Sequence, residues 1–303
     1  MSPSIKEAAA MLRRGEVVAF PTETVYGLGV NALDAGAVQK VYELKGRPAT
    51  SPLIVHVDSI EMARTLLTEW PSLAEELARK HWPGPLTMVL PKRALIPDIV
   101  TAGLQTVGIR VPSHPIALEL IREAGIPLAA PSANKFTGVS PTTAEHVREA
   151  FGDAVPVIDG GPCTVGIEST VVAVEGSALT LLRLGMIDVY PLPHGRGSVQ
   201  GEGEAHRAPG MHQRHYSPRT PVLLIDVSSR LPGGDGAYMW RTQSAETKRA
   251  VQMPMDPQQY AAQLYATLHL LDHDGLPWIA VEVPPDTPEW SAIRDRLKRA
   301  ASK

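Results

Sequence analysis

Two short clusters of polar residues form a candidate binding site for an anion. Lys45-Gly46-Arg47-Pro48 and Ala130-Pro131-Ser132-Ala133-Asn134 each place two polar side chains two residues apart, in a turn-prone segment after an apolar run. The Lys ammonium is a mobile point charge and the Arg guanidinium a planar fork, so the two can bind different phosphoryl oxygens. Ser and Asn add hydrogen bonds without charge. The two clusters together predict a polyphosphate site.

An ordinary basic helix end is the alternative interpretation of the first cluster. Cations near a helix C-terminus are favoured by the helix dipole, and this explains Lys45 on its own. It does not explain why an Arg fork stands two residues further on, or why a second cluster carries Ser132 and Asn134. The anion site is therefore the stronger hypothesis.

Two expected strands carry polar side chains on the face opposite their apolar side. Side chains alternate along a strand, so Arg110 lies with Gly108 on one face of the strand at 106–111, away from its valines and isoleucine. In the strand at 53–57, His56 lies opposite the side that carries Leu53 and Val55. A lone strand histidine is more often a satisfied structural residue than a ligand. Arg110 and His56 are nevertheless placed where a ligand could reach them.

The two clusters occur in a fixed order with three further segments. These segments are 20–29 (FPTETVYGLG), 108–112 (GIRVP) and 166–172 (GIESTVV). Together they strongly resemble the YrdC-like threonylcarbamoyl-AMP synthases, over residues 5–185. Residues 209–211 (PGM) and 214–218 (RHYSP) resemble the interdomain linker of the longer, two-domain form of that family.

The resemblance implies a nucleotidyltransferase that makes L-threonylcarbamoyladenylate. In that family L-threonine and bicarbonate or CO₂ give an N-carboxylated threonine, whose carbamate oxygen attacks the α-phosphorus of ATP and releases diphosphate. Mg²⁺ is expected through the ATP phosphates, with no metal ligand identified in the chain. The product supplies the threonylcarbamoyl group for a tRNA adenosine next to the anticodon. The resemblance also implies a downstream tRNA threonylcarbamoyl transferase complex as partner.

The family pattern assigns two groups of site residues. The L-threonine group, in which Arg110 pairs with the carboxylate, is Thr24, His56, Arg110, Ala130 and Ser169. The ATP group is Lys45, Arg47, Ser51, Thr106, Ser132, Asn134, Ser140, Arg183 and Tyr216, with Lys45 and Arg47 also in the catalytic role. Ser51 departs from the pattern, which has Asn before Pro-Leu, so its contact with phosphate is expected only through water.

The implied reaction requires that the substrates are positioned and that developing charge is stabilised, more than it requires a strong base. Two anions must be brought together in line, and the charge on the departing diphosphate must be neutralised. The product is a mixed anhydride that water destroys, so a lid that excludes water is useful. The linker at 191–220, which carries Arg214, His215 and Tyr216, is the segment expected to form this lid. A passive, solvated spacer is the alternative.

Helix and strand patterns alternate along the first part of the chain and predict an α/β fold. The expected organisation is a YrdC-like catalytic domain at 1–190 with a twisted mixed sheet and flanking helices, the linker at 191–220, and a smaller C-terminal α/β, Rossmann-like domain at 221–303. Ser4 with Glu7 and Thr142 with Glu145 have the spacing of helix-opening capping boxes. Residues 155–158 read as a strand.

Composition limits the classes of protein that fit. The net charge is -3, with 44% hydrophobic and 20% charged residues, which is typical of a globular chain and does not suggest stable nucleic-acid binding. Apolar runs are strand-length and no secretory leader is recognisable, so a cytoplasmic protein without a membrane span is expected. The single cysteine, Cys163, excludes an internal disulfide and a cysteine zinc site, and is expected to be a small core residue.

Three other functions stay open. A hydrogenase-maturation carbamoyltransferase contains a related module but requires cysteine-rich zinc fingers, which a chain with one Cys lacks. A non-catalytic RNA-binding or translation-associated module is disfavoured by the absence of net positive charge. A related enzyme acting on another carbamoyl or acyl adenylate keeps the same clusters and differs only in its substrate. No hydrolytic triad order, zinc protease motif or P-loop signals a different chemistry.

Overall fold

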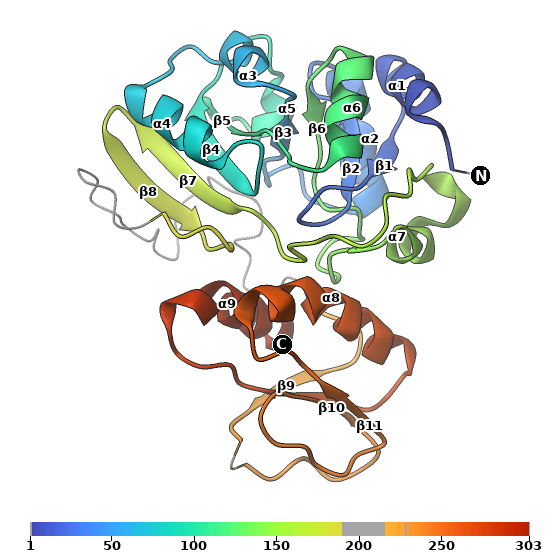
Figure 1. Cartoon of the computed structure of the whole chain (residues 1–303). Helices are drawn as coiled ribbons and strands as arrows, with labels where there is room; N and C mark the ends of the chain where they lie inside the picture. Colours follow the sequence, from blue (N-terminus) through green and yellow to red (C-terminus); the bar gives the residue numbers. More distant parts are fainter. Residues whose placement is uncertain (1, 190–215, 228, 303) are drawn as a thin grey trace.

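The chain folds into two bodies, each built on its own sheet. The computed structural model describes residues 2–189, 216–227 and 229–302. An eight-stranded sheet has the order β1-β2-β6-β3-β5-β4-β7-β8, and a four-stranded sheet has the order β11-β10-β12-β9. In Figure 1 the helices α8 and α9 of the second body face the first body. The expected α/β class, with a mixed sheet and a smaller second α/β unit, is confirmed.

The first body supplies eight strands and most of the helices. Its strands are β1 (Val18–Phe20), β2 (Gly27–Asn31), β3 (Ile54–His56), β4 (Leu86–Pro91), β5 (Thr106–Arg110), β6 (Leu128–Ala129), β7 (Thr170–Glu175) and β8 (Ala178–Arg183). Its helices are α1 (Ile5–Arg13), α2 (Ala35–Lys45), α3 (Ile60–Leu66), α4 (Ser72–His81), α5 (Asp98–Thr101), α6 (Pro115–Ala124) and α7 (Ala144–Phe151), followed by the 3₁₀ turn η1 (Gly152–Ala154).

Parallel pairing of β3 with β5 brings two expected site residues side by side. The register places His56 opposite Arg110 and Val55 opposite Ile109. Val55 and Ile109 are fully buried in the main apolar cluster, so the polar pair lies on the other face of the sheet. The strand faces predicted from alternation are confirmed.

Helix α2 ends where the Lys-x-Arg cluster begins. Asp34 caps its N-terminus by accepting hydrogen bonds from the backbone of Gly36 and Ala37. Gly46 closes its C-terminus in the left-handed conformation, at φ 64°, which suits glycine. This turn directs the chain back over the sheet, so that Arg47 follows directly after the helix.

The local predictions were confirmed in part. The first capping box is present, with Ser4 and Glu7 bonding each other's backbone. The second is wrong, because the backbone N–H of Thr142 donates to the imidazole of His146 and Thr143 takes the cap position instead. The expected strand at 155–158 is instead a single parallel bridge between Val157 and Ala19, on the edge of the three-residue strand β1 that does not pair with β2. Strands β2, β10 and β11 were not predicted.

The second body is a parallel sheet with helices on the side that faces the first body. Its elements are β9 (Val222–Ile225), β10 (Ala237–Trp240), β11 (Arg249–Gln252), α8 (Pro257–His273), β12 (Ile279–Glu282), the 3₁₀ turn η2 (Pro288–Trp290) and α9 (Ser291–Ala301). All of its strand pairs are parallel. The domain limits at 190 and 220 stay predictions, and residues 191–215 of the expected lid lie outside the described residues.

One apolar cluster joins the two bodies. Val25 and Ile167 of the first body are buried together with Tyr260, Leu264 and Tyr265 of the second. Buried apolar area contributes about 25 cal/mol per Å², so this shared core stabilises the packing of the two bodies.

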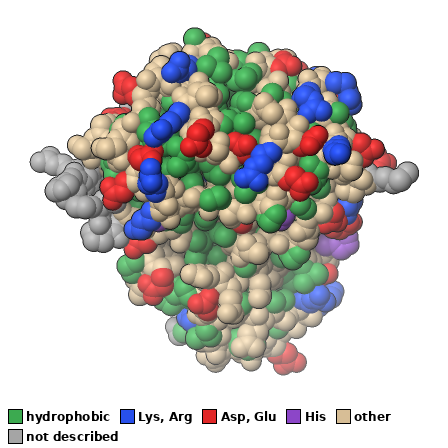
Figure 2. All heavy atoms as spheres, turned by 45° about the horizontal axis from the view of Figure 1, so that its top comes forward, with side chains coloured by type: hydrophobic (Ala, Val, Ile, Leu, Met, Phe, Trp, Pro, Cys, Tyr) green, Lys and Arg blue, Asp and Glu red, His purple; other side chains and the backbone are tan. Residues whose placement is uncertain are grey.

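The surface carries mixed charge and no apolar span. Figure 2 shows acidic and basic side chains interspersed over the visible face, with no continuous basic stripe there. Among the described residues, none of the helices combines the length and apolarity that crossing a membrane requires.

Gly166 lies at the junction between the bodies and yields a direct test of their packing. Its φ is +78°, and a Cβ built on it would lie 2.4 Å from the backbone oxygen of Ala261 in α8. Gly161 has nearly the same φ, +76°, but its Cβ would meet nothing within 4 Å. The two glycines therefore share the conformational cost of substitution and differ in the contact.

We expect Gly166→Ala to lower the free energy of unfolding more than Gly161→Ala does. Both lose roughly 1 kcal/mol from left-handed strain, whereas Gly166→Ala adds overpacking of about 1–3 kcal/mol at the junction. Urea unfolding of both variants measures the difference. Equal losses would show that α8 does not pack closely on this turn.

Candidate functional site

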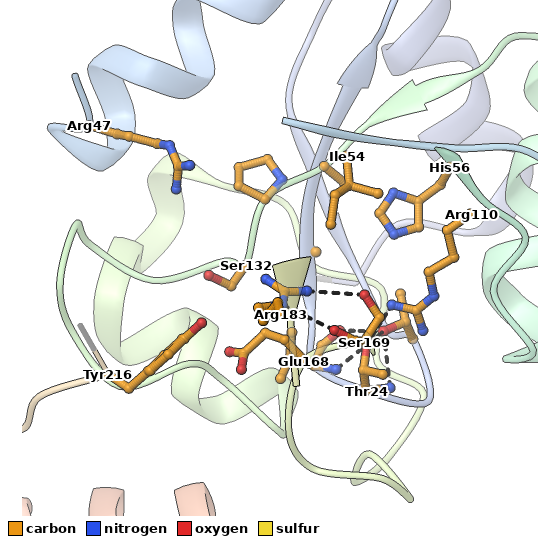
Figure 3. Close-up of a pocket in the computed structure, with 15 residues that line it drawn as sticks. Thr24, Arg47, Ile54, His56, Arg110, Ser132, Glu168, Ser169, Arg183 and Tyr216 are labelled. Carbon is orange, nitrogen blue, oxygen red and sulfur yellow. Dashed lines mark hydrogen bonds between the residues drawn. The ribbon is translucent and has the colours of Figure 1, made fainter. Parts of the chain in front are cut away.

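One pocket gathers residues from distant parts of the chain. It is lined by Thr22, Thr24, Val25, Gly27, Arg47, Ile54, His56, Arg110, Ala130, Pro131, Ser132, Glu168, Ser169, Arg183 and Tyr216. Figure 3 shows His56, Arg110 and Thr24 toward one end, and Arg47, Ser132 and Tyr216 toward the other. Ser169, Arg183 and Glu168 lie between the two ends.

Arg110 dominates the first end of the pocket. Its Nη1 donates to Thr24 Oγ1 at 2.9 Å and its Nε to the backbone oxygen of Gly84 at 3.2 Å. Its Nη2 lies 2.7 Å from Glu23 Oε1. These partners fix the plane of the guanidinium before any ligand arrives, which suits a fork-like contact with a carboxylate.

Glu23 is a partner of the site that sequence reasoning missed. Burial acts to raise the pKa of its carboxyl group, but the charge of Arg110 and its hydrogen bonding outweigh burial, so the pKa is lowered. Glu23 is therefore ionised and balances the charge of Arg110. The only sequence signal was its place between Thr22 and Thr24 in the 20–29 segment.

His56 stands beside Arg110 as a neutral imidazole. Burial, followed by the charge of Arg110, lowers its pKa to about 3. Its Nδ1 is buried and has no hydrogen-bond partner among the described residues. A neutral ring beside a guanidinium adds hydrogen bonding without further charge, which fits a small polar ligand.

Ser169 and Arg183 connect the two ends. Arg183 at the end of β8 donates from Nη2 to Ser169 Oγ and from Nε to the Ser169 backbone oxygen, both at 3.0 Å. Ser169 Oγ lies 2.8 Å from Thr87 Oγ1 on β4. Three neighbouring strands, β4, β7 and β8, thus fix the middle of the pocket.

Arg47 brings a buried positive charge to the second end. Its Nη2 donates to the backbone oxygen of Pro52 at 3.1 Å, and its Nε is buried without a partner among the described residues. Burial lowers its pKa to about 10. An anion would supply the missing acceptor and reduce the cost of burying the charge.

Tyr216 lines the second end of the pocket and comes from a distant part of the sequence. Its backbone has φ 61°, an uncommon value for a residue other than glycine. Its ring packs on Tyr265 of α8, with ring centroids 5.7 Å apart, and under the guanidinium of Arg296, 5.2 Å from the centroid. Side chains of the second body therefore seat this pocket residue.

Family models match nearly the whole chain. The model described as "Telomere recombination" matches residues 10–185. The model described as "Threonylcarbamoyl-AMP synthase, C-terminal domain" matches residues 179–302. The chain belongs to the threonylcarbamoyl-AMP synthase family. The resemblance read from the motifs is confirmed.

The alignments with similar proteins extend over both bodies of the chain. The chain is 41% identical to the threonylcarbamoyl-AMP synthase of Bacillus subtilis, over 99% of this chain and 93% of that protein. It is 38% identical to the Pyrococcus abyssi protein of the same name, over 98% and 94%. The crystal structure of P. abyssi Sua5 complexed with L-threonine superposes with a TM-score of 0.89 at 37% identity, covering 98% of this chain and 94% of that one.

The pocket brings together most of the residues that the family pattern assigned. The predicted residues that line it are Thr24, Arg47, His56, Arg110, Ala130, Ser132, Ser169, Arg183 and Tyr216. The predicted residues that do not line it are Lys45, Ser51, Thr106, Asn134 and Ser140. Their individual roles in this family member stay predictions.

Lys45 holds the wall of the pocket instead of lining it. Its Nζ donates to the backbone oxygens of Ser132 and Asn134, both at 2.6 Å, and its side chain is buried. Burial, then the nearby charges of Arg47 and Lys135, lower its pKa well below the usual range. Truncating Lys45 is therefore expected to cost stability, because two buried carbonyl groups depend on it.

The other residues outside the lining lie in supporting positions. Ser51 is buried beneath the pocket, and its backbone oxygen accepts from the hydroxyl of Tyr42. Thr106 begins β5, opposite Pro91. Asn134 donates to the backbone oxygens of Lys135 and Gly138. Ser140 donates to Glu168, a pocket residue that sequence reasoning had not assigned.

Cys163 is a buried thiol outside the pocket lining. Cys163 is buried and free, and burial raises the pKa of its thiol to about 12, so a reactive thiolate is excluded at neutral pH. Within residues 2–189, 216–227 and 229–302, no group of three His, Cys, Asp or Glu side chains is arranged to hold a metal ion.

We expect Arg47→Ala and Lys45→Ala to fail in different ways. Arg47→Ala should bind ATP about 10- to 100-fold more weakly, since a charge-assisted contact contributes about 1.5–3 kcal/mol, and should keep most of its stability. Lys45→Ala should lose about 1–3 kcal/mol of unfolding free energy as well, because two buried carbonyl groups lose their donor. Calorimetric ATP titration and urea unfolding separate the two effects.

Lys40→Ala is the matched control. Lys40 lies on the same helix, α2, and its ammonium group donates to the backbone oxygen of Gly15, away from the pocket. Wild-type ATP affinity in folded Arg47→Ala would contradict the assignment of Arg47 to the phosphate end.

Proposed function

We propose that this chain converts L-threonine, bicarbonate and ATP into L-threonylcarbamoyladenylate, diphosphate and water. The main observation in support of this reaction is that the pocket has two ends. Arg110, His56 and Thr24 lie at one end, and Arg47, Ser132 and Tyr216 at the other (Figure 3). A small amino acid and a nucleotide that must react with each other require adjoining sites of this kind. The chain's membership of the threonylcarbamoyl-AMP synthase family supports the same reaction.

The first end is suited to the amino acid. The fork of Arg110 faces the pocket and would pair with the threonine carboxylate, while Thr24 and Ser169 offer hydroxyl groups to the rest of the molecule. Glu23 keeps Arg110 oriented from behind. His56 is neutral at physiological pH, so it adds no repulsion toward the ammonium or amine nitrogen.

The second end is suited to the triphosphate. Arg47 and Arg183 are buried cations on the pocket wall, and they would neutralise charge that develops on the departing diphosphate. Ser132 adds a hydroxyl group between them and Tyr216. Mg²⁺ would enter on the phosphate oxygens as part of the Mg–ATP substrate.

The reaction proceeds by in-line displacement. The amine nitrogen of threonine is carboxylated, and a carbamate oxygen attacks the α-phosphorus of ATP as the bond to the β-phosphate oxygen breaks. The new P–O bond and the released diphosphate balance the step. The protein orients two anions and stabilises the departing charge.

The product is a mixed anhydride, and its chemistry suggests where it goes. Such a product is hydrolysed by water, so it requires prompt transfer. We propose that it supplies a tRNA threonylcarbamoyl transferase complex in the cytoplasm, for adenosine modification next to the anticodon. The lid function of the linker at 191–220 belongs to the same proposal.

Product analysis is the test of this function. Purified protein is incubated with ATP, Mg²⁺ and bicarbonate, and with each amino acid in turn, and the products are identified by mass spectrometry. The expected result is a threonine-dependent adenylate together with diphosphate. A non-catalytic RNA-binding module would give no adenylate, and an enzyme for another acyl or carbamoyl group would give one with a different substrate.

We expect Arg110→Lys to raise the KM for threonine about tenfold or more, with the KM for ATP changed by less than about twofold. Lysine keeps the charge but loses the planar fork that serves both Glu23 and a carboxylate. Steady-state kinetics with each substrate varied measures the split. Arg122→Lys, on the exposed side of α6, is the control. Equal changes in both KM values would remove Arg110 from the amino acid end.

A further inference from the structure

The second body contributes a buried ion pair to the wall of the pocket. Arg296 lies on α9, and its side chain has 0% exposure. Its Nε is 2.8 Å from Glu168 Oε2. Its Nη2 donates to the backbone oxygen of Leu184 and its Nη1 to Asp295, both at 2.8 Å. Helix α9 is thereby connected to the first body through one fully enclosed guanidinium.

Glu168 is the acidic residue on the pocket lining. Its Oε1 accepts a hydrogen bond from Ser140 Oγ at 2.6 Å, and its Oε2 accepts one from the hydroxyl of Tyr265 at 3.0 Å. Burial acts to raise its pKa, but the charges of Arg296 and Arg183 and its hydrogen bonds outweigh burial, so the pKa is lowered. The carboxylate therefore carries its negative charge toward a pocket that must accept a polyanion.

An unneutralised carboxylate at this position would repel a triphosphate. Like charges a few ångströms apart cost several kcal/mol where water is excluded. Arg296 is the cation that bonds this carboxylate directly, and it comes from the other body. The nearby Arg183 is already bonded to Ser169.

The same guanidinium also supports Tyr216. The ring of Tyr216 lies 5.2 Å from the Arg296 guanidinium carbon and stacks on Tyr265. Tyr216 holds an uncommon backbone conformation, φ 61°, which persists only when neighbouring groups fix it. Tyr216 and Glu168 both line the pocket (Figure 3).

We propose that Arg296 is a positioning residue for the nucleotide, which neutralises Glu168 and seats Tyr216 so that ATP affinity depends on the docked second body. This inference rests on the proposed function in one respect, namely that this end of the pocket binds ATP. It gives the short C-terminal body a role in substrate binding that neither family membership nor the motifs assign. The competing explanation is that Arg296 only holds the two bodies together. In that case its substitution would change stability without changing ATP affinity.

The experiment compares full-length variants by calorimetric titration with Mg–ATP in the absence of amino acid. The variants are Arg296→Met, Glu168→Gln and the double variant, with unfolding followed in parallel. Arg294→Met is the matched control, since Arg294 lies on the same helix but donates to Pro284 and pairs with Asp286.

Arg296→Met should weaken ATP binding about tenfold or more, because Glu168 loses its ion-pair partner, and the hydrogen bonds of Ser140 and Tyr265 and the charge of Arg183 compensate only in part. The double variant should recover most of that loss, because the repelling carboxylate is gone, and this non-additivity identifies Glu168 as the intermediary. Glu168→Gln alone should keep ATP affinity within about twofold or raise it, since a cation remains. Arg294→Met should stay within about twofold of the wild type.

Two results would overturn the inference. One is an Arg296→Met variant that binds ATP as the wild type does, and the other is a double variant as weak as Arg296→Met. Removing one partner of a buried pair can unfold a protein. In that case Arg296→Gln takes its place, since Gln keeps a hydrogen-bond donor and loses the charge, and a loss of ATP affinity below about twofold would then count against the proposal.

Failure of this inference is distinguishable from failure of the proposed function. ATP affinity is measured without threonine, so it does not depend on which adenylate is made. A wild-type protein that binds ATP but forms no threonine-dependent adenylate contradicts the proposed function, while the Arg296 variants still decide the inference.

Discussion

Burial of positive charge is the constraint on which this structure depends. Lys45, Arg47, Arg110, Arg183 and Arg296 are all buried, and a buried cation is costly unless it is paired or hydrogen-bonded. Each pairing fixes a different part of the molecule. The ammonium of Lys45 holds the Ser132–Asn134 segment to helix α2, the Arg110 fork is fixed by the 20–29 segment, and the Arg296 guanidinium joins the second body to the turn before β7. The pocket is the space that these pairings enclose.

The partners of each buried cation indicate whether it supports the fold or is available to bind a ligand. Lys45 and Arg296 have partners inside the protein, so removing either leaves acceptors or a carboxylate exposed to an apolar interior. Arg47 keeps a buried Nε without a partner among the described residues, and His56 keeps a buried Nδ1 in the same condition. Such groups are costly in a folded protein unless a ligand completes them. They lie at opposite ends of the pocket, which is the arrangement that two reacting substrates require.

The predictions from sequence succeeded where one element decides the outcome. Alternation along β3 and β5 placed His56 and Arg110 on the polar face, and the capping box of Ser4 with Glu7 marked the start of α1. They were wrong or incomplete where a side-chain contact without a periodic pattern decides the outcome. The cap of α7 moved from Thr142 to Thr143 because the neighbouring His146 competes for the backbone. Pairings such as Glu23 with Arg110 leave no periodic signal, and the motifs alone assigned Lys45 to the ligand although it bonds the backbone.

The second body completes an apolar cluster that the first body does not complete alone. Val25 and Ile167 of the first body lie in an apolar cluster that is completed by α8 and α9, and Gly166 lets the backbone of α8 approach closely. Glu168, two residues further on, pairs with Arg296, and both Glu168 and its neighbour Ser169 line the pocket. The turn that docks the second body is therefore continuous with the middle of the site. A first body without its partner would expose apolar surface and a carboxylate without its ion-pair partner at the same place, so docking of the second body and the shape of the middle of the pocket depend on the same contacts.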